Sequence, residues 1–153
     1  MSGESFDLPE VRSFTAGTVG PAGERIFYLQ AVTDLETVSV RLEKGQVQAL
    51  ATAVDQLLDN IGADREGAPP VELVEPVTEL WTVAALGVGW DSDDERLVVV
   101  AQELVTDEEA AVEAAEGRFH LRPDQARGFV EHAVFLVEYG RDFGRQNGHK
   151  PPQ

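Results

Sequence analysis

The sequence of 153 residues contains no cysteine. This absence excludes a disulfide framework, a thiol nucleophile and any cysteine-ligated zinc or iron–sulfur site. Basic residues are also few, 12 against 28 acidic ones, which leaves a formal net charge of −16. Because such a surface repels phosphate groups, we expect no binding to nucleic acids or anionic membranes. A basic protein partner or a cationic ligand remains compatible with this charge.

The sequence also lacks a targeting segment and long apolar runs. Residues 1–7 contain no basic region and no apolar stretch, so a secretory signal is not expected. No run approaches the roughly 20 apolar residues that a membrane-spanning helix needs. We therefore predict a cytoplasmic protein, and no residue pattern indicates a cofactor. The length fits a single domain over residues 1–153.

Hydrophobic periodicity predicts an α+β fold built from two similar β-β-β-α halves. The first half, at about 11–62, has expected strands and a helix at 11–20, 25–32, 37–42 and 44–61. The second half, at about 78–140, has them at 80–90, 96–103, 118–121 and 123–139. Residues 62–76 would link the halves, and 141–153 would form a polar tail. The simplest assembly is one mostly antiparallel sheet with both helices on one face.

Two local matches relate the halves and predict an internal duplication. Residues 24–29 align with 95–100, and residues 40–46 align with 119–125. The offset changes between the matches because the second half contains an additional acidic segment at 106–116. Gln46 and Gln125 correspond in this alignment and fall near the third helical position. They could form a paired site, but Gln at this position usually accepts the backbone N–H of the N-cap residue, so we favour capping.

One acidic cluster could bind a hard cation such as Ca²⁺. It lies between two expected strands and comprises Asp91, Asp93, Asp94 and Glu95. The cluster lacks the glycine and the distant glutamate of a calcium-binding loop, so a solvated hairpin tip is the favoured interpretation. His120 and His132 belong to no metal-spaced pair, and no serine lies in a nucleophile elbow. Catalysis is therefore the weaker hypothesis.

The second expected helix is apolar almost all round near its end. Val134 and Phe135 lie outside its inner apolar stripe and are followed by Leu136 and Val137. Either this helix is buried on two sides, or its second face contacts another subunit or a partner. Both alternatives stay open at this point.

Four segments resemble an uncharacterised actinobacterial family, domain-of-unknown-function family 3090, which belongs to a conserved trio of uncharacterised proteins. They are Phe14–Gly20, Phe27–Ala31, Val38–Lys44 and Gln125–Phe129. The resemblance runs from about Phe6 to His149 and implies a bacterial cytoplasmic setting without an assigned activity. Members of that family typically end in a cysteine-rich knuckle that resembles a zinc ribbon. This chain keeps the Arg-x-Asn-Gly-His-like end at 145–149 but has 140–144 in place of the knuckle.

Two hypotheses of different classes follow from the sequence. The first is a non-enzymatic protein-interaction or regulatory module, which is dimeric or binds a partner through the second helix. The alternative is a small-ligand- or cation-binding enzyme with its site between the halves. That site would use Arg25, Arg41 or the acidic tip at 91–95. Convergent polar groups in a pocket would favour the alternative.

Overall fold

The computed structural model of the protein describes residues 3–21, 23–106 and 113–148. Within these ranges the chain forms strands β1 to β7 and helices α1 and α2. The first half of the chain contains β1 (Phe6–Leu8), β2 (Ser13–Val19), β3 (Ile26–Val32), β4 (Thr37–Leu42) and α1 (Lys44–Asn60). The second contains β5 (Glu79–Asp91), β6 (Arg96–Glu103), β7 (Glu116–Leu121) and α2 (Pro123–Gly148). The predicted α+β class is confirmed.

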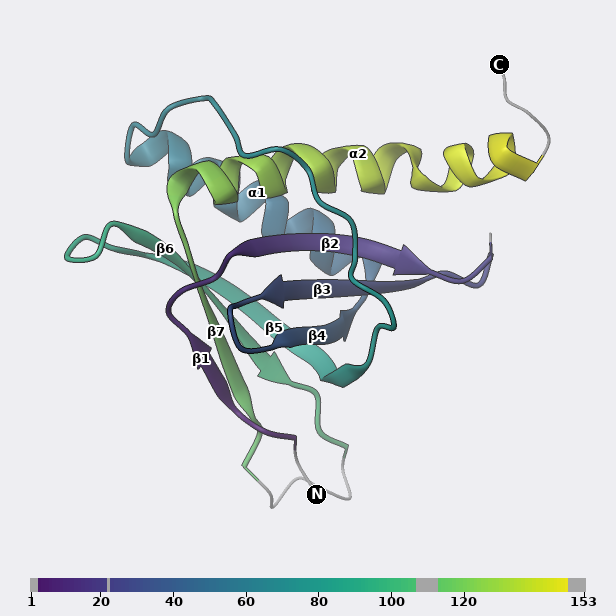
Figure 1. The fold of residues 1–153 in the computed structure, drawn as a ribbon, viewed down its shortest axis with the longest axis horizontal. Coiled ribbons are helices and arrows are strands. Elements are labelled where there is room, and N and C mark those ends of the chain that lie inside the picture. Colours follow the sequence, from purple (N-terminus) through teal and green to yellow (C-terminus); the bar gives the residue numbers. More distant parts are fainter. Residues whose placement is uncertain (1–2, 22, 107–112, 149–153) are drawn as a thin grey trace.

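The strands form one mixed sheet in the order β1-β7-β6-β5-β4-β3-β2. The β4–β5 and β1–β7 pairs are parallel, and the other neighbours are antiparallel. Only residues 9–12 separate β1 from β2, although these strands stand at opposite ends of the order. The sheet therefore curls until its two edges approach each other, and both helices lie together on one side of it (Figure 1). The predicted arrangement of sheet and helices is confirmed.

The two halves interlock rather than sit side by side. Helix α1 follows β4 and packs against β5, whereas α2 follows β7 and packs against β2. Strand β5 pairs in parallel with β4 near its start and antiparallel with β6 along the rest of its length. Strands β1 and β2 divide the same two pairings between them, with β7 and β3. Each helix thus stabilises the other half of the fold.

Strand pairing corrects the sequence alignment of the second strands by one residue. Leu29 pairs with Val40, and Val99 pairs with Phe119. Because Val40 and Phe119 correspond, Leu29 corresponds to Val99, whereas the sequence alignment places it on Val100. Leu29 and Val99 are fully buried, and Val100 faces the other side of the sheet. The alignment of 24–29 with 95–100 followed the shared Glu-Arg pair, which lies outside the alternating core pattern.

The core lies between the curled sheet and the two helices. Helix α1 buries the predicted apolar stripe of Val47, Leu50, Ala51, Val54 and Leu58. Phe14, Phe119 and Phe129 join β2, β7 and α2 at the centre, where Phe14 has ring-centroid distances of 5.2 Å and 4.9 Å to the other two. Such aromatic contacts add about 0.5–1.5 kcal/mol to the burial of each pair. One apolar core therefore connects both halves.

Helix α2 is longer than the sequence predicts. It continues to Gly148 instead of ending near Tyr139, so the predicted polar tail at 141–153 is helical over most of its length. Gly140 and Gly144 each cost about 1 kcal/mol of helix propensity but do not stop a helix, and the next proline comes only at Pro151. Residues 140–144, where the resemblance places a knuckle, are therefore part of α2. The helical turn considered within 106–116 lies mostly at 107–112, outside the described residues.

The predicted linker at 62–76 is docked onto the fold. Gly62 has φ +70° and ends α1, with Ala63 N–H donating to Leu58 O at 3.0 Å, as a C-terminal cap requires. Residues 67–76, which we call the strap, then cross α2 and run down over β2 and β3 (Figure 1). At the crossing, a Cβ on Gly128 would lie 2.4 Å from Ala68 O, so only glycine fits there. The strap fixes α2 against the sheet from outside.

Candidate functional site

A row of buried polar side chains crosses the outer face of the first half beneath the strap. Thr15, Gln30 and Ser39 occupy neighbouring positions on β2, β3 and β4, and at most 3% of each residue is exposed. Gln30 binds both backbone groups of Val74: its Nε2 donates to Val74 O at 3.1 Å, and its Oε1 accepts the Val74 N–H at 2.7 Å. Thr15 Oγ1 donates to Val71 O at 3.0 Å. This row holds the strap, and its groups are satisfied by it.

Arg25 and Arg41, the two candidate binding arginines, lie on opposite faces of the sheet. Arg41 pairs with Tyr28 and Thr82 in the sheet and belongs to the outer face. Arg25 lines a hollow of about 190 Å³ on the helix side, together with Phe27 of β3 and Lys44 of α1. The structure therefore does not bring the two arginines together, and Arg25 acquires partners that lie far from it in sequence. Nothing in the periodicity indicates this grouping.

The acidic tip at 91–95 forms a tight turn. Asp91 Oδ1 accepts the backbone N–H groups of Asp93 at 3.0 Å and Asp94 at 3.3 Å, and Glu95 adopts φ 56°. Among the described residues, no three His, Asp or Glu side chains are grouped so that they could hold a metal ion. The geometry supports the hairpin-tip interpretation of Asp91, Asp93, Asp94 and Glu95. Cation binding by these residues stays an untested prediction.

Each histidine named as a catalytic candidate contacts a single polar neighbour. His120 Nε2 lies 2.6 Å from Asp7 Oδ1, across the parallel β1–β7 pair. His132 Nε2 lies 3.1 Å from Ala16 O, which joins α2 to β2. Neither contact includes a nucleophile, so both are consistent with structural roles.

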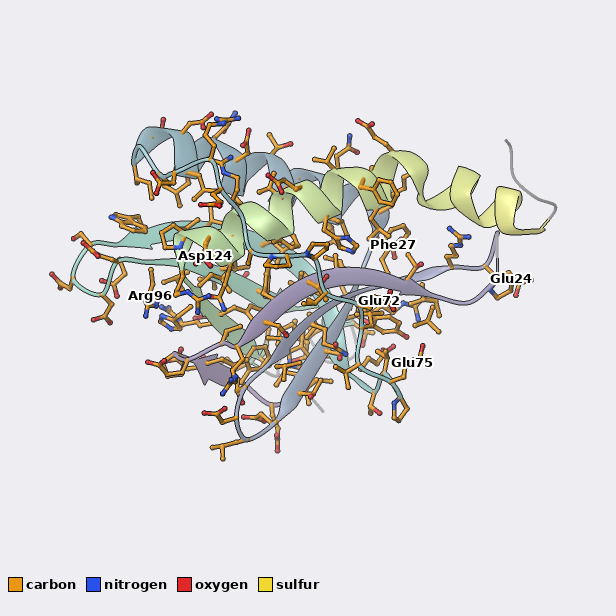
Figure 2. All side chains as sticks on the ribbon, turned by 45° about the horizontal axis from the view of Figure 1, so that its top comes forward. Glu24, Phe27, Glu72, Glu75, Arg96 and Asp124 are labelled. Carbon is orange, nitrogen blue, oxygen red and sulfur yellow. The ribbon has the colours of Figure 1, made fainter. Side chains whose placement is uncertain are left out.

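The open hollow at the junction of the halves is polar, but its charged groups bond to one another or to nearby backbone. It measures about 800 Å³ and lies between residues 61–69, the β5–β6 hairpin and the start of α2. Arg122 Nε and Nη2 donate to the two carboxylate oxygens of Asp124 at 2.9 and 3.1 Å. Arg96 Nη1 donates to the carbonyl oxygens of Asp94 and Glu95. Figure 2 shows Arg96 and Asp124 at this end of the molecule.

The hydrogen bonds from Arg122 lower the pKa of Asp124 below its ordinary value of 3.8, and the carboxylate raises the pKa of Arg122. Asp124 lies in the first turn of α2, where a negative charge is also favoured by the helix dipole. The pair therefore stays ionised at neutral pH and stabilises the start of α2. It offers no group poised for proton transfer.

Sequence reasoning missed a buried arginine between the helices. Arg127 of α2 is 3% exposed, and its Nη1 donates to Asp55 Oδ1 of α1 at 2.8 Å. Its Nη2 lies 3.8 Å from Asp59 Oδ1, and neither Nη2 nor Nε has a hydrogen-bond partner within the described part of the chain. An arginine on a helix usually extends to solvent, so the sequence carries no signal of this burial.

The outer side of α2 exposes two large apolar side chains. Val134 is 45% exposed and Phe135 is 49% exposed, whereas Phe129 and Ala133 on the inner side are buried. The predicted surplus of apolar residues on this helix is thus divided: Leu136 and Val137 pack against the core, and Val134 and Phe135 face outward. No helix in the described ranges combines the length and apolar character needed to span a bilayer.

Comparison with known proteins gives one match. A family model described as "Protein of unknown function (DUF3090)" matches residues 5–146. No curated protein and no solved structure matches the chain. The match confirms the family resemblance that the sequence segments indicate and covers all the described strands and most of α2.

Proposed function

The chain belongs to this family of proteins of unknown function, DUF3090, and from that premise we propose that it is a non-enzymatic protein-interaction module. The observation that carries the proposal is the half-exposed pair Val134 and Phe135 on α2. Adjacent large apolar side chains in water lose the free energy that burial would supply, about 1.5–3 kcal/mol for each fully buried side chain. A partner that covers them recovers part of it.

The contact surface is a stripe on one side of α2. We define the α2 stripe as Glu131, Val134, Phe135 and Glu138, all of which are exposed. Their spacing of three, four and seven residues places them on one helical face. An apolar centre with an acidic residue one turn before and one turn after it results. Helix α2 also extends beyond the sheet, which gives a partner access to this face (Figure 1).

The charge of the stripe indicates the chemistry of the partner. Glu131 and Glu138 flank the apolar pair, and the whole chain carries a net charge of −16. A partner segment with an apolar side chain between lysines or arginines would complement both features. A second copy of the chain would instead bring like charges together. We therefore infer a basic amphipathic segment of another protein as the occupant.

The weak catalytic equipment of the described residues also supports an interaction role. The enclosed cavity between the strap, β2 and α2 measures about 60 Å³, which is far below the roughly 300–1,000 Å³ of typical ligand sites. The larger hollow at the junction of the halves contains charged groups that already bond to one another or to nearby backbone. Neither place combines a nucleophile with a base.

The test uses site-specific photocrosslinking with the full chain. A benzophenone amino acid replaces Val134, or replaces Leu35 as a control, because Leu35 is 93% exposed on the β3–β4 turn. We expect an adduct from Val134 alone, to a protein with a basic amphipathic segment at the crosslinked position. The purified partner should then bind the wild-type chain about tenfold or more tightly than the Phe135→Ser variant. Its affinity should fall as salt is added.

The competing outcomes are distinct. Equal adducts from both positions, or no adduct, would overturn the proposal. An adduct only to a second copy of the chain would replace the basic partner with a homodimer. A partner that binds Phe135→Ser as well as wild type would exclude the α2 stripe as the contact surface.

A further inference from the structure

The hollow around Arg25 is a second surface with a defined chemistry, independent of the α2 stripe. It lies on the helix side of the β2–β3 hairpin, and six of its lining residues are Thr18, Arg25, Phe27, Lys44, Leu136 and Val137. Figure 2 shows Phe27 beneath α2, whereas Glu24 lies farther out at the hairpin end. We propose that this hollow, called here the Arg25 pocket, binds a small carboxylate with an apolar body.

The anionic group follows from the charges of the lining. Arg25 and Lys44 come from different elements, and none of the described lining residues is acidic. Such a pairing is unusual in a chain with 12 basic and 28 acidic residues. At a salt concentration of 0.1 M, charges farther than about 10 Å are largely screened, so the two local cations dominate the potential within the pocket. A carboxylate is therefore attracted there in spite of the net charge of the chain.

The apolar body follows from the other walls. Phe27, Leu136 and Val137 are partly buried hydrophobic residues that pack against the core and also line the pocket. The volume of about 190 Å³ fits a single ring or a short alkyl chain better than a nucleotide or a peptide. Pockets with apolar walls and a few convergent polar groups are the usual form of small-molecule sites. The pocket joins α2 of one half to β3 and α1 of the other.

The test is a titration of the ¹⁵N-labelled full chain, followed by amide chemical shifts, with four probes. Phenylacetate carries both features, phenyl phosphate changes the anion, phenylacetamide removes the charge, and inorganic phosphate removes the ring. We expect phenylacetate to shift the amides of Thr18, Phe27 and Val137 in a saturable manner. Phenylacetamide should bind about tenfold more weakly because it lacks charge-assisted hydrogen bonds. Phenyl phosphate at equal affinity would support the anionic site but replace the carboxylate by any aryl anion.

Matched variants separate the pocket from the net charge. Lys44→Gln and Arg25→Gln should each weaken phenylacetate binding about tenfold. Arg65→Gln makes the same charge change at an arginine whose side chain is 80% exposed, outside the pocket, and should leave binding unchanged. Val137→Phe should reduce binding by filling the pocket without a change of charge. Dispersed spectra would show that each variant is folded.

Four results would overturn the inference. They are no saturable shift up to the solubility limit of phenylacetate, equal midpoints for phenylacetate and phenylacetamide, shifts from inorganic phosphate equal to those from phenylacetate, and equal weakening by Arg65→Gln and Lys44→Gln. None of these results bears on the α2 stripe, because Val134 and Phe135 are not among the pocket's lining residues. Failure of one proposal is therefore distinguishable from failure of the other.

Discussion

Leu73 of the strap lies directly over Gly17 of β2. A Cβ at position 17 would stand 2.6 Å from Leu73 Cγ, a separation that real side chains do not tolerate. The glycine is therefore required by the strap rather than by the backbone conformation of β2, since its φ is not in the left-handed region. The corresponding position of the second half is open: a Cβ on Gly89 would meet nothing within 4 Å.

Gly17→Ala and Gly89→Ala should consequently have opposite effects on stability. We expect Gly17→Ala to lower the free energy of unfolding by about 1–3 kcal/mol through overpacking. Gly89→Ala should raise it by about 0.4–1 kcal/mol, because alanine restricts the unfolded chain. Urea denaturation of both variants measures the difference. Leu73→Ala should relieve part of the Gly17→Ala effect, and equal losses for the two glycine variants would disprove the docking of the strap.

The buried Arg127 should couple the two helices energetically. Asp55→Ala removes the partner that Arg127 Nη1 contacts at 2.8 Å and leaves a buried cation behind. We expect a loss of about 1–3 kcal/mol, less than for a fully buried pair because the Asp55 side chain is 44% exposed. In an Arg127→Met background the same change should cost about 0.5 kcal/mol or less. A double-mutant cycle with no coupling would show that the pair is incidental.

The two helix caps are equivalent in geometry but unequal in burial. Gln46 Oε1 accepts the Glu43 N–H at 2.7 Å, and Gln125 Oε1 accepts the Arg122 N–H at 2.8 Å. Each Nε2 then donates to the other half: Gln46 to Val83 O, and Gln125 to the carbonyl oxygens of residues 11 and 12. The capping interpretation of both glutamines is confirmed. The caps also fasten each helix to the first strand of the opposite half or to the residues just before it.

Removal of these caps should destabilise the protein by different amounts. Gln46→Ala should cost about 1 kcal/mol, as the loss of a partly exposed helix cap does. Gln125→Ala should cost about 2 kcal/mol, because Gln125 is 5% exposed and Val11 O is left unsatisfied in the interior. Gln56→Ala, at an exposed position in the middle of α1, serves as the control and should change stability little. Thermal or urea unfolding compares the three variants.

The Arg122–Asp124 pair predicts one pH dependence. The lowered pKa of Asp124 means that the unfolded chain binds this proton more readily than the folded one. Its contribution to stability is therefore fully present above the ordinary pKa of 3.8 and is lost as the pH falls through the lowered value. The stability difference between wild type and Asp124→Asn should shrink on acidification through this window. A difference that stays constant from neutral pH down through this window would contradict the role of the pair.

The sequence predicts those elements whose side chains alternate or recur with a clear period. Strand β4 and the start of α1 follow from the alternation of 37–42 and the stripe that begins at Val47, and both are confirmed. Strand β1 was missed because three residues, Phe6–Leu8, carry no period. The end of α2 was misplaced because Gly140 lowers helix propensity without ending the helix.

The candidate sites depend on contacts that no local pattern encodes. Arg25 was identified, but its neighbours Lys44 and Val137 reach it only after α1 and α2 cross the curled sheet. The polar residue Gln30 interrupts an apolar strand and carries a signal, yet its partner Val74 lies in a segment that reads as a linker. Arg41 was grouped with Arg25 because both are arginines near expected strand ends, although the alternation of β3 and β4 assigns them to opposite faces.

The charge pattern of the α2 stripe predicts the behaviour of the isolated protein. If the stripe binds a basic partner, the chain alone should remain monomeric at micromolar concentration in low salt, because Glu131 and Glu138 of two copies would repel each other. Light scattering and sedimentation equilibrium measure this directly. Phe135→Glu should abolish partner binding and lower the free energy of unfolding by about 1 kcal/mol or less, since half of its ring is already exposed. A wild-type dimer that Phe135→Glu dissociates would identify a second copy as the occupant and reject the basic partner, whereas a dimer that persists in this variant would place self-association on another surface.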